Sequence, residues 1–445
     1  MSIIASKNTK SNTVTVNKPE VEVMRSDLRD NRILATNVTV SNDTWKTKMN
    51  NNDLVVGGTG AGKTRGYIRP NIEQTMNESI VVADTKGNLY DLYKDMLRKR
   101  GYKVCNIDFK NIGDTRVGYN PLHYIRKNSA GRYLDQDIIK LGSFLIPSAL
   151  SHDPFWENSA QNFLNCATAL MLETCEEEDI NMSTLFEYAG MINTPEFASL
   201  IDEVREEDNG SYAVKCYRQV EDTRGTDKTM SSILSVMRNA ISLCESNDVL
   251  KLFMHDNQLR FETLGEEKTA LFLTISDSDR SMDGIVNLLY TNMFNALIDH
   301  ADKQKGSRLK VPVHFYMDDF ATNTRIPDFD NLISVIRSRE ISVSIIVQNL
   351  EQLKKCYPAG STTIIANCDH MLVLSAHDQP TADYVANRIG KMTTNVMNLP
   401  ANKAILIEAG RPYRIVDKIV LSPGKTSAKT SAASKLDAKP LTSER

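Results

Sequence analysis

The sequence predicts an α/β fold with a mainly parallel sheet, together with an inserted all-α domain. Two observations lead to this prediction. Apolar segments of strand length alternate with helical segments near both ends of the chain, and strand patterns vanish between about 135 and 255, where helical periodicity takes over. A chain of 445 residues can hold one large α/β domain and a second, smaller one.

The first half of the predicted sheet begins with a short apolar strand at 54–56, which leads into a glycine-rich loop. A helix is expected over 65–76, a second buried strand over 79–84, an amphipathic basic helix over 89–101 and a third strand over 102–108. This alternation indicates parallel strands joined by crossover helices. Residues 1–45 are polar and weakly patterned, and are treated as an N-terminal arm with a short strand at 38–40.

The middle of the chain is predicted to be helical, for example over 161–175 and 228–243. Acidic runs at 176–179 and 203–208 are interpreted as solvated helix ends rather than metal sites. Strands return at 269–275, 311–317, 341–347, 370–375 and 404–408. The expected division is an arm (1–45), a nucleotide-binding domain in two parts (46–175 and 263–421), an all-α domain (176–262) and a disordered tail (422–445).

Composition limits the possible functions. The 53 Lys and Arg residues against 56 Asp and Glu give a net charge of −3, so contact with nucleic acid would need a local basic lining. Seven scattered cysteines without a C-x-x-C pair indicate neither zinc nor disulfides, and fit a reducing cytosol. The sequence shows no signal-peptide pattern and no run of the roughly 20 apolar residues that a membrane helix needs.

The strongest motif is a phosphate-binding loop, G-x-x-x-x-G-K-[ST], between a predicted strand and a predicted helix. Its residues are Gly57, Gly58, Thr59, Gly60, Ala61, Gly62, Lys63 and Thr64. Glycines let the backbone N–H groups turn toward a phosphate, and the following helix directs its positive end at the same anion. Lys63 is expected to neutralise the β- and γ-phosphates of ATP, and the Thr64 hydroxyl to bind Mg²⁺.

An acidic pair, Asp318 and Asp319, follows the predicted strand at 311–317. The first carboxylate of such a pair holds Mg²⁺, and the second can polarise the attacking water. Asp84, at the end of its own strand, is the competing candidate. Asp318 is preferred because a pair of carboxylates can perform both tasks.

Two further polar positions lie downstream of the acidic pair. Arg337 is either an arginine finger that reaches the γ-phosphate in a neighbouring subunit or a solvated helix end. Gln348, at the end of the strand at 341–347, either senses the γ-phosphate and orients water or caps the next helix.

Several segments then resemble one family in the same order along the chain: 84–87, 118–122, 153–160, 318–321, 326–329, 336–350 and 365–369. Together with the phosphate-binding loop, these segments resemble the type IV coupling proteins of conjugation, the TraG/TraD-like branch of the FtsK/HerA motor superfamily. The resemblance extends from about residue 50 to about 420.

The resemblance implies a RecA-like motor domain with a small all-α domain, assembled as a homo-hexamer. It implies ATP-driven transfer of single-stranded DNA, with an attached relaxase, into a type IV secretion channel. By position, Lys63 and Thr64 match the phosphate and Mg²⁺ residues, and Asp318 the Walker B carboxylate. Arg337 matches the arginine finger, and Gln348 the sensor.

Two departures from the family pattern affect the expected activity and location. The family usually has Glu where this chain has Asp319, so turnover is expected to be slow or to depend on assembly. The family also usually carries N-terminal membrane helices, which this sequence lacks. The expectation is a cytoplasmic protein that a membrane-anchoring partner holds at the membrane, or a soluble variant of the motor.

Two other functions stay open at this point. One is a ring motor for double-stranded DNA, although the sequence carries no winged-helix module after the motor. The other is a nucleotide-gated recruiting platform with little turnover, which the shorter carboxylate of Asp319 favours.

Overall fold

The computed structural model describes residues 30–147, 154–224, 226–320 and 325–419. The predicted disordered tail and most of the predicted arm lie outside these residues. Within the described residues, no helix is both long enough and apolar enough to cross a membrane.

A nine-stranded sheet in the order β11-β10-β9-β3-β8-β7-β4-β6-β5 forms the centre of the motor domain. Its strands are β3 (Asp53–Val56), β4 (Ser79–Asp84), β5 (Lys103–Asp108), β6 (Thr269–Thr274), β7 (Val313–Met317), β8 (Ile341–Val347), β9 (His370–Val373), β10 (Lys403–Glu408) and β11 (Arg414–Asp417). The pairs from β9 through β3 to β5 are parallel, and the antiparallel pairs are those of β10 with β9 and with β11. The predicted mainly parallel sheet is therefore confirmed.

Burial explains why most strands were visible in the sequence. In β3, β4, β6, β7 and β9 every residue is buried, and most of these residues are apolar, as parallel strands covered on both faces should be. The edge strand β11 has one buried residue in four, and the sequence analysis did not predict it.

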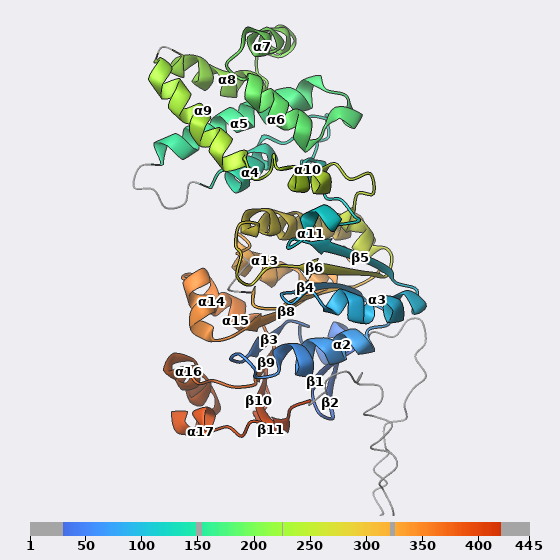
Figure 1. The fold of residues 1–445 in the computed structure, drawn as a ribbon. Coiled ribbons are helices and arrows are strands. Elements are labelled where there is room, and N and C mark those ends of the chain that lie inside the picture. Colours follow the sequence, from blue (N-terminus) through green and yellow to red (C-terminus); the bar gives the residue numbers. More distant parts are fainter. Residues whose placement is uncertain (1–29, 148–153, 225, 321–324, 420–445) are drawn as a thin grey trace, which may run out of the picture.

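Helices cover both faces of the sheet (Figure 1). They are α2 (Arg69–Gln74), α3 (Leu89–Lys99), α11 (Asp283–Lys303), α13 (Phe329–Val335), α14 (Leu350–Cys356), α15 (Ser361–Ala366), α16 (Gln379–Ile389) and α17 (Thr393–Met397). The helix predicted at 65–76 begins with a π-helical turn, η1 (Lys63–Ile68), before α2. π-Helical turns are rare and are frequent at functional sites.

A second group of helices stands beyond the β5 end of the sheet (Figure 1). It comprises α4 (Asp135–Leu145), α5 (Phe155–Thr174), α6 (Met182–Met191), α7 (Pro195–Glu207), α8 (Tyr212–Thr223) and α9 (Asp227–Ile241), and α10 (Asn247–Phe253) leads back to the sheet. The fully buried stretch of α5 packs against α4, α6, α8 and α9. This packing places α5 in the all-α domain, which we propose begins before the predicted boundary at 176.

The described end of the predicted arm contains a hairpin, and the second strand of this hairpin includes the strand predicted at 38–40. Its strands β1 (Asn31–Ala35) and β2 (Val38–Ser41) pair antiparallel, and α1 (Thr44–Thr47) follows. Arg32 of β1 is fully buried, so the hairpin packs against the motor domain through a charged side chain. A pattern of apolar residues could not reveal this packing, because the buried residue is an arginine.

Candidate functional site

Three parallel neighbours in the sheet, β3, β8 and β7, bring the predicted site residues to one edge. Parallel strands end at the same edge, and the loop 57–64 follows β3, Gln348 follows β8 and Asp318 follows β7. The order of these strands therefore places Gln348 between the glycine-rich loop and the acidic pair.

The glycine-rich loop is tied down at its start and left-handed in its middle. The Gly57 N–H donates to the Val347 carbonyl at 3.1 Å, and the Gly58 N–H donates to Ser375 Oγ at 3.1 Å. Gly60 and Gly62 have φ angles of 79° and 100°, which side-chain-bearing residues rarely adopt. The loop conformation thus depends on glycine at both positions.

Lys63 and Thr64 direct their side chains at the edge where the acidic pair lies. Lys63 Nζ donates to the Gly57 carbonyl at 3.0 Å and stands 3.6 Å from Asp319 Oδ1. Thr64 Oγ1 donates to Asp318 Oδ2 at 2.9 Å. An ammonium group, a hydroxyl and a carboxylate thus meet beside a loop of backbone N–H groups, which is the set of groups that binds a phosphate chain and its cation.

Asp318 is 7% exposed, and its surroundings disfavour its charge. Burial, together with the neighbouring Asp319, raises the pKa of Asp318 to about 6, although Thr64 and Lys63 act in the opposite direction. A bound divalent cation would supply the missing positive charge. Mg²⁺ is usually bound by one or two carboxylates together with phosphates and water, so phosphate and water would complete the coordination beside Asp318.

Asp319 has a left-handed backbone, with φ at 50°. Its carboxylate accepts a long hydrogen bond from Gln348 Nε2, at 3.4 Å. Asp adopts this conformation more readily than most side-chain-bearing residues, although Glu340 of this chain also has it, with φ at 63°. The backbone at this turn is compatible with Asp at this position.

The competing candidate, Asp84, has a structural task. Its carboxylate accepts hydrogen bonds from the backbone N–H groups of Lys86, Gly87 and Leu89, at 3.1, 2.9 and 2.6 Å. It therefore holds the turn between β4 and α3, and its oxygens are already used.

Arg337 does not join the other predicted residues within one chain. It lies in the 3₁₀ turn η6 (Arg337–Arg339), which precedes β8, so it lies at the opposite edge of the sheet from the glycine-rich loop. Seven residues of β8 separate the two edges by roughly 20 Å. Arg337 is exposed, and its side chain makes no hydrogen bond or ion pair with any residue that the structure describes, whereas Arg339 binds Asp302 through two bonds of 2.9 Å.

Ser375 is a site residue that the sequence analysis missed. Its hydroxyl holds the Gly58 N–H from the loop that follows β9. In the sequence, Ser375 is a polar residue at the end of the strand predicted at 370–375. Its position beside the glycine-rich loop follows only from the pairing of β9 with β3.

Residues 15–413 match the family described as Type IV secretory system Conjugative DNA transfer. The chain therefore belongs to this family of conjugative DNA-transfer proteins, as its motifs predicted. The comparison with curated proteins finds no match.

Several solved structures share the fold. The bacterial conjugative coupling protein TrwBdeltaN70, in an unbound form, aligns with a TM-score of 0.62 and 17% identity over 88% of this chain and 89% of that chain. The plasmid coupling protein TrwB in complex with ADP and Mg²⁺ aligns with a TM-score of 0.61 and 17% identity, over 88% and 90%. VirB4 of Thermoanaerobacter pseudethanolicus aligns with a TM-score of 0.51 and 15% identity, over 89% and 98%. The fold is thus RecA-like with a helical domain.

Proposed function

We propose that this chain is the ATP-driven coupling ATPase of a conjugative type IV secretion system. It recruits relaxase-bound single-stranded DNA to the secretion channel. The observation that carries the proposal is the contact of Thr64 with Asp318, which joins the end of the glycine-rich loop to the acid after β7. Family membership supports the conjugative role, and the ADP and Mg²⁺ complex of TrwB supports the choice of ATP and Mg²⁺ as ligands.

In this proposal the loop 57–64 surrounds the β-phosphate, and Lys63 neutralises the β- and γ-phosphates. Thr64 and Asp318 would hold Mg²⁺, and the ion would supply positive charge for the charge that develops on the phosphates. Asp319 polarises the attacking water, and Gln348, which already contacts Asp319, orients that water or senses the γ-phosphate.

Arg337 enters the proposal as a residue that acts in a neighbouring subunit. Since it lies at the opposite edge of the sheet, it reaches a γ-phosphate only if a second copy presents that edge to the site. This geometry supports a homo-hexameric ring with sites between subunits. Contacts with the channel and with a membrane-anchoring partner, at the cytoplasmic face of the membrane, complete the proposed role.

Lys63→Ala tests the proposal. The variant should lose nearly all ATP hydrolysis that single-stranded DNA stimulates, while its melting temperature stays close to that of the wild type. Full DNA-stimulated activity in Lys63→Ala would exclude the mechanism.

A mixture of two variants tests the site between subunits. Lys63→Ala and Arg337→Ala should each be inactive alone, and activity should partly return on mixing, because some interfaces then combine an intact loop with an intact arginine. Arg339→Ala is the matched control, since Arg339 is bound to Asp302. An Arg337→Ala variant that is as active as the wild type would remove Arg337 from the site.

A recruiting platform with little turnover is the second candidate, and the short carboxylate of Asp319 favours it. The two functions differ in one measurement. A platform binds ATP and hydrolyses it at a rate that DNA does not change.

A further inference from the structure

A buried polar network lies one layer beneath the candidate site. Asp53 on β3, Ser344 on β8 and His314 on β7 each stand four residues before the site residue that follows the strand. Asp53 pairs in register with Ser344 on one side and with His370 of β9 on the other. These side chains are almost fully buried. The same strands that carry the site thus carry a row of polar groups below it.

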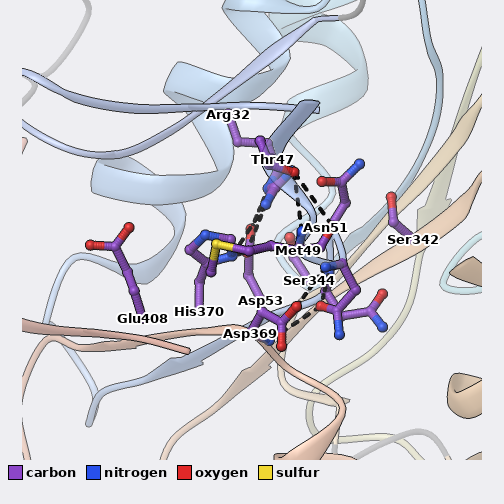
Figure 2. Close-up of polar contacts among 12 residues, drawn as sticks. Arg32, Thr47, Met49, Asn51, Asp53, Ser342, Ser344, Asp369, His370 and Glu408 are labelled. Carbon is purple, nitrogen blue, oxygen red and sulfur yellow. Dashed lines mark hydrogen bonds and ion pairs between the residues drawn. The ribbon is translucent and has the colours of Figure 1, made fainter. Parts of the chain in front are cut away.

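Asp53 is the centre of this network (Figure 2). Its carboxylate binds Arg32 Nε at 2.7 Å and Arg32 Nη2 at 3.1 Å, and it stands 3.2 Å from His370 Nδ1. Burial would raise the pKa of Asp53, but Arg32 and His370 hold that pKa well below its usual range. Arg32 comes from the N-terminal hairpin, so the hairpin supplies the charge that keeps Asp53 ionised.

Tyr67 connects this network to the phosphate-binding loop. It is fully buried in the π turn η1, three residues after Thr64. Its hydroxyl donates to Asp53 Oδ2 at 2.5 Å and lies 2.7 Å from Ser344 Oγ. The tyrosine therefore links the start of β3, before the loop, to the helical turn that follows the loop.

The hydrogen bonds of the network run in one direction. Burial, with a smaller effect of Arg32, lowers the pKa of His314 to about 3, so the ring is neutral and has one donor. His314 Nε2 lies 2.7 Å from Ser344 Oγ, and its Nδ1 lies 2.7 Å from Ser342 Oγ. Tyr67 donates its hydroxyl proton to Asp53, so its oxygen accepts a hydrogen bond from the Ser344 hydroxyl. Ser344 in turn accepts a hydrogen bond from His314. The other ring nitrogen of His314 accepts from the Ser342 hydroxyl. Each hydroxyl donates once, and the chain ends on the carboxylate.

We propose that Tyr67 is a positioning residue of the phosphate-binding loop. Its hydroxyl, held between Asp53 and Ser344, fixes the π turn so that the Thr64 hydroxyl and the N–H groups of the loop face the nucleotide phosphates. The inference rests on the proposed nucleotide function. Apolar packing alone would fill this space, but it would not set the rotation of the turn.

Tyr67→Phe removes only the hydroxyl and keeps the buried ring. The affinity of the full chain for a fluorescent ATP analogue with Mg²⁺ should weaken by about three- to tenfold. This is the loss expected when the hydrogen-bonding groups of the loop are misplaced. Tyr93→Phe is the matched control. Tyr93 is also buried, and its substitution by Phe removes hydrogen bonds to Arg69 and Glu73. These bonds join α2 to α3, and Tyr93 makes no hydrogen bond to Asp53 or Ser344.

The two variants distinguish positioning from general stability. Tyr67→Phe should weaken nucleotide binding while Tyr93→Phe leaves it unchanged, even where both lower the melting temperature. In a Ser344→Ala background, the effect of Tyr67→Phe on binding should shrink, because the two groups act together. Wild-type affinity in Tyr67→Phe, or equal weakening in both variants, would overturn the inference. A wild-type chain that binds no nucleotide would instead overturn the proposed function, and the inference with it.

Discussion

Two buried aspartates on neighbouring layers of one sheet edge have opposite electrostatics. Asp53, beneath the site, has a pKa held well below its usual range by Arg32 and His370, against the effect of its burial. Asp318, in the site, has a pKa raised to about 6 by burial and by Asp319. The charge of Asp53 is balanced by groups of the protein itself. The charge of Asp318 is not fully balanced, and a buried carboxylate of this kind is a candidate for binding a cation.

The largest expected effect is on Asp53. Asp53→Asn leaves the Arg32 charge buried without its partner, so the free energy of unfolding should fall by about 3–5 kcal/mol. Chemical denaturation measures the loss. The control is Asp91→Asn, because Asp91 is an exposed partner of Lys94 and should cost less than about 1 kcal/mol. A loss for Asp53→Asn no larger than that of the control would show that the network does not hold the hairpin.

Asp318→Asn should have the opposite effect on stability. It removes a buried charge, so the nucleotide-free protein should gain about 1–3 kcal/mol at pH 7 while losing Mg²⁺-dependent hydrolysis. Protonated Asp318 stabilises the native state below its usual pKa near 4, and this contribution is lost as pH rises through about 6. The gain from the substitution should therefore vanish near pH 4. Destabilisation at pH 7 would contradict the comparison.

The pH dependence of cation binding sharpens the same contrast. Protons compete with Mg²⁺ for the Asp318 carboxylate, so the affinity for Mg²⁺ with nucleotide should fall toward tenfold per pH unit below about 6. Titrations of the nucleotide complex between pH 5 and pH 8 measure it, with pH chosen in about half-unit steps. A flat profile in this range would place the cation elsewhere.

The smallest effect is expected at Asp319. Asp319→Glu should cost about 0.5–1 kcal/mol of stability, because φ is 50° there, and it should raise turnover by bringing the carboxylate one methylene nearer the water. Asp328 has a φ of 52° away from the loop, so Asp328→Glu should cost similar stability without changing turnover. Unchanged or reduced turnover in Asp319→Glu would show that carboxylate length does not limit the reaction.

The sequence revealed the fold wherever burial was apolar. The runs at 79–84 and 341–347 have the bounds of β4 and β8, since parallel strands covered on both faces are mainly apolar. The glycine-rich loop and Asp318 could be paired because each follows such a strand. The hairpin with Arg32, the role of Ser375 and the tie from Tyr67 to Asp53 could not be predicted. They depend on polar side chains that meet only after distant strands have paired.

The most direct test of the proposed motor is its rate of ATP hydrolysis as a function of chain concentration, with and without single-stranded DNA. Sites shared between subunits predict a rate per chain that rises steeply with concentration and rises further with DNA. A rate near zero at every concentration, in a chain that still binds ATP, would contradict the motor and favour the recruiting platform.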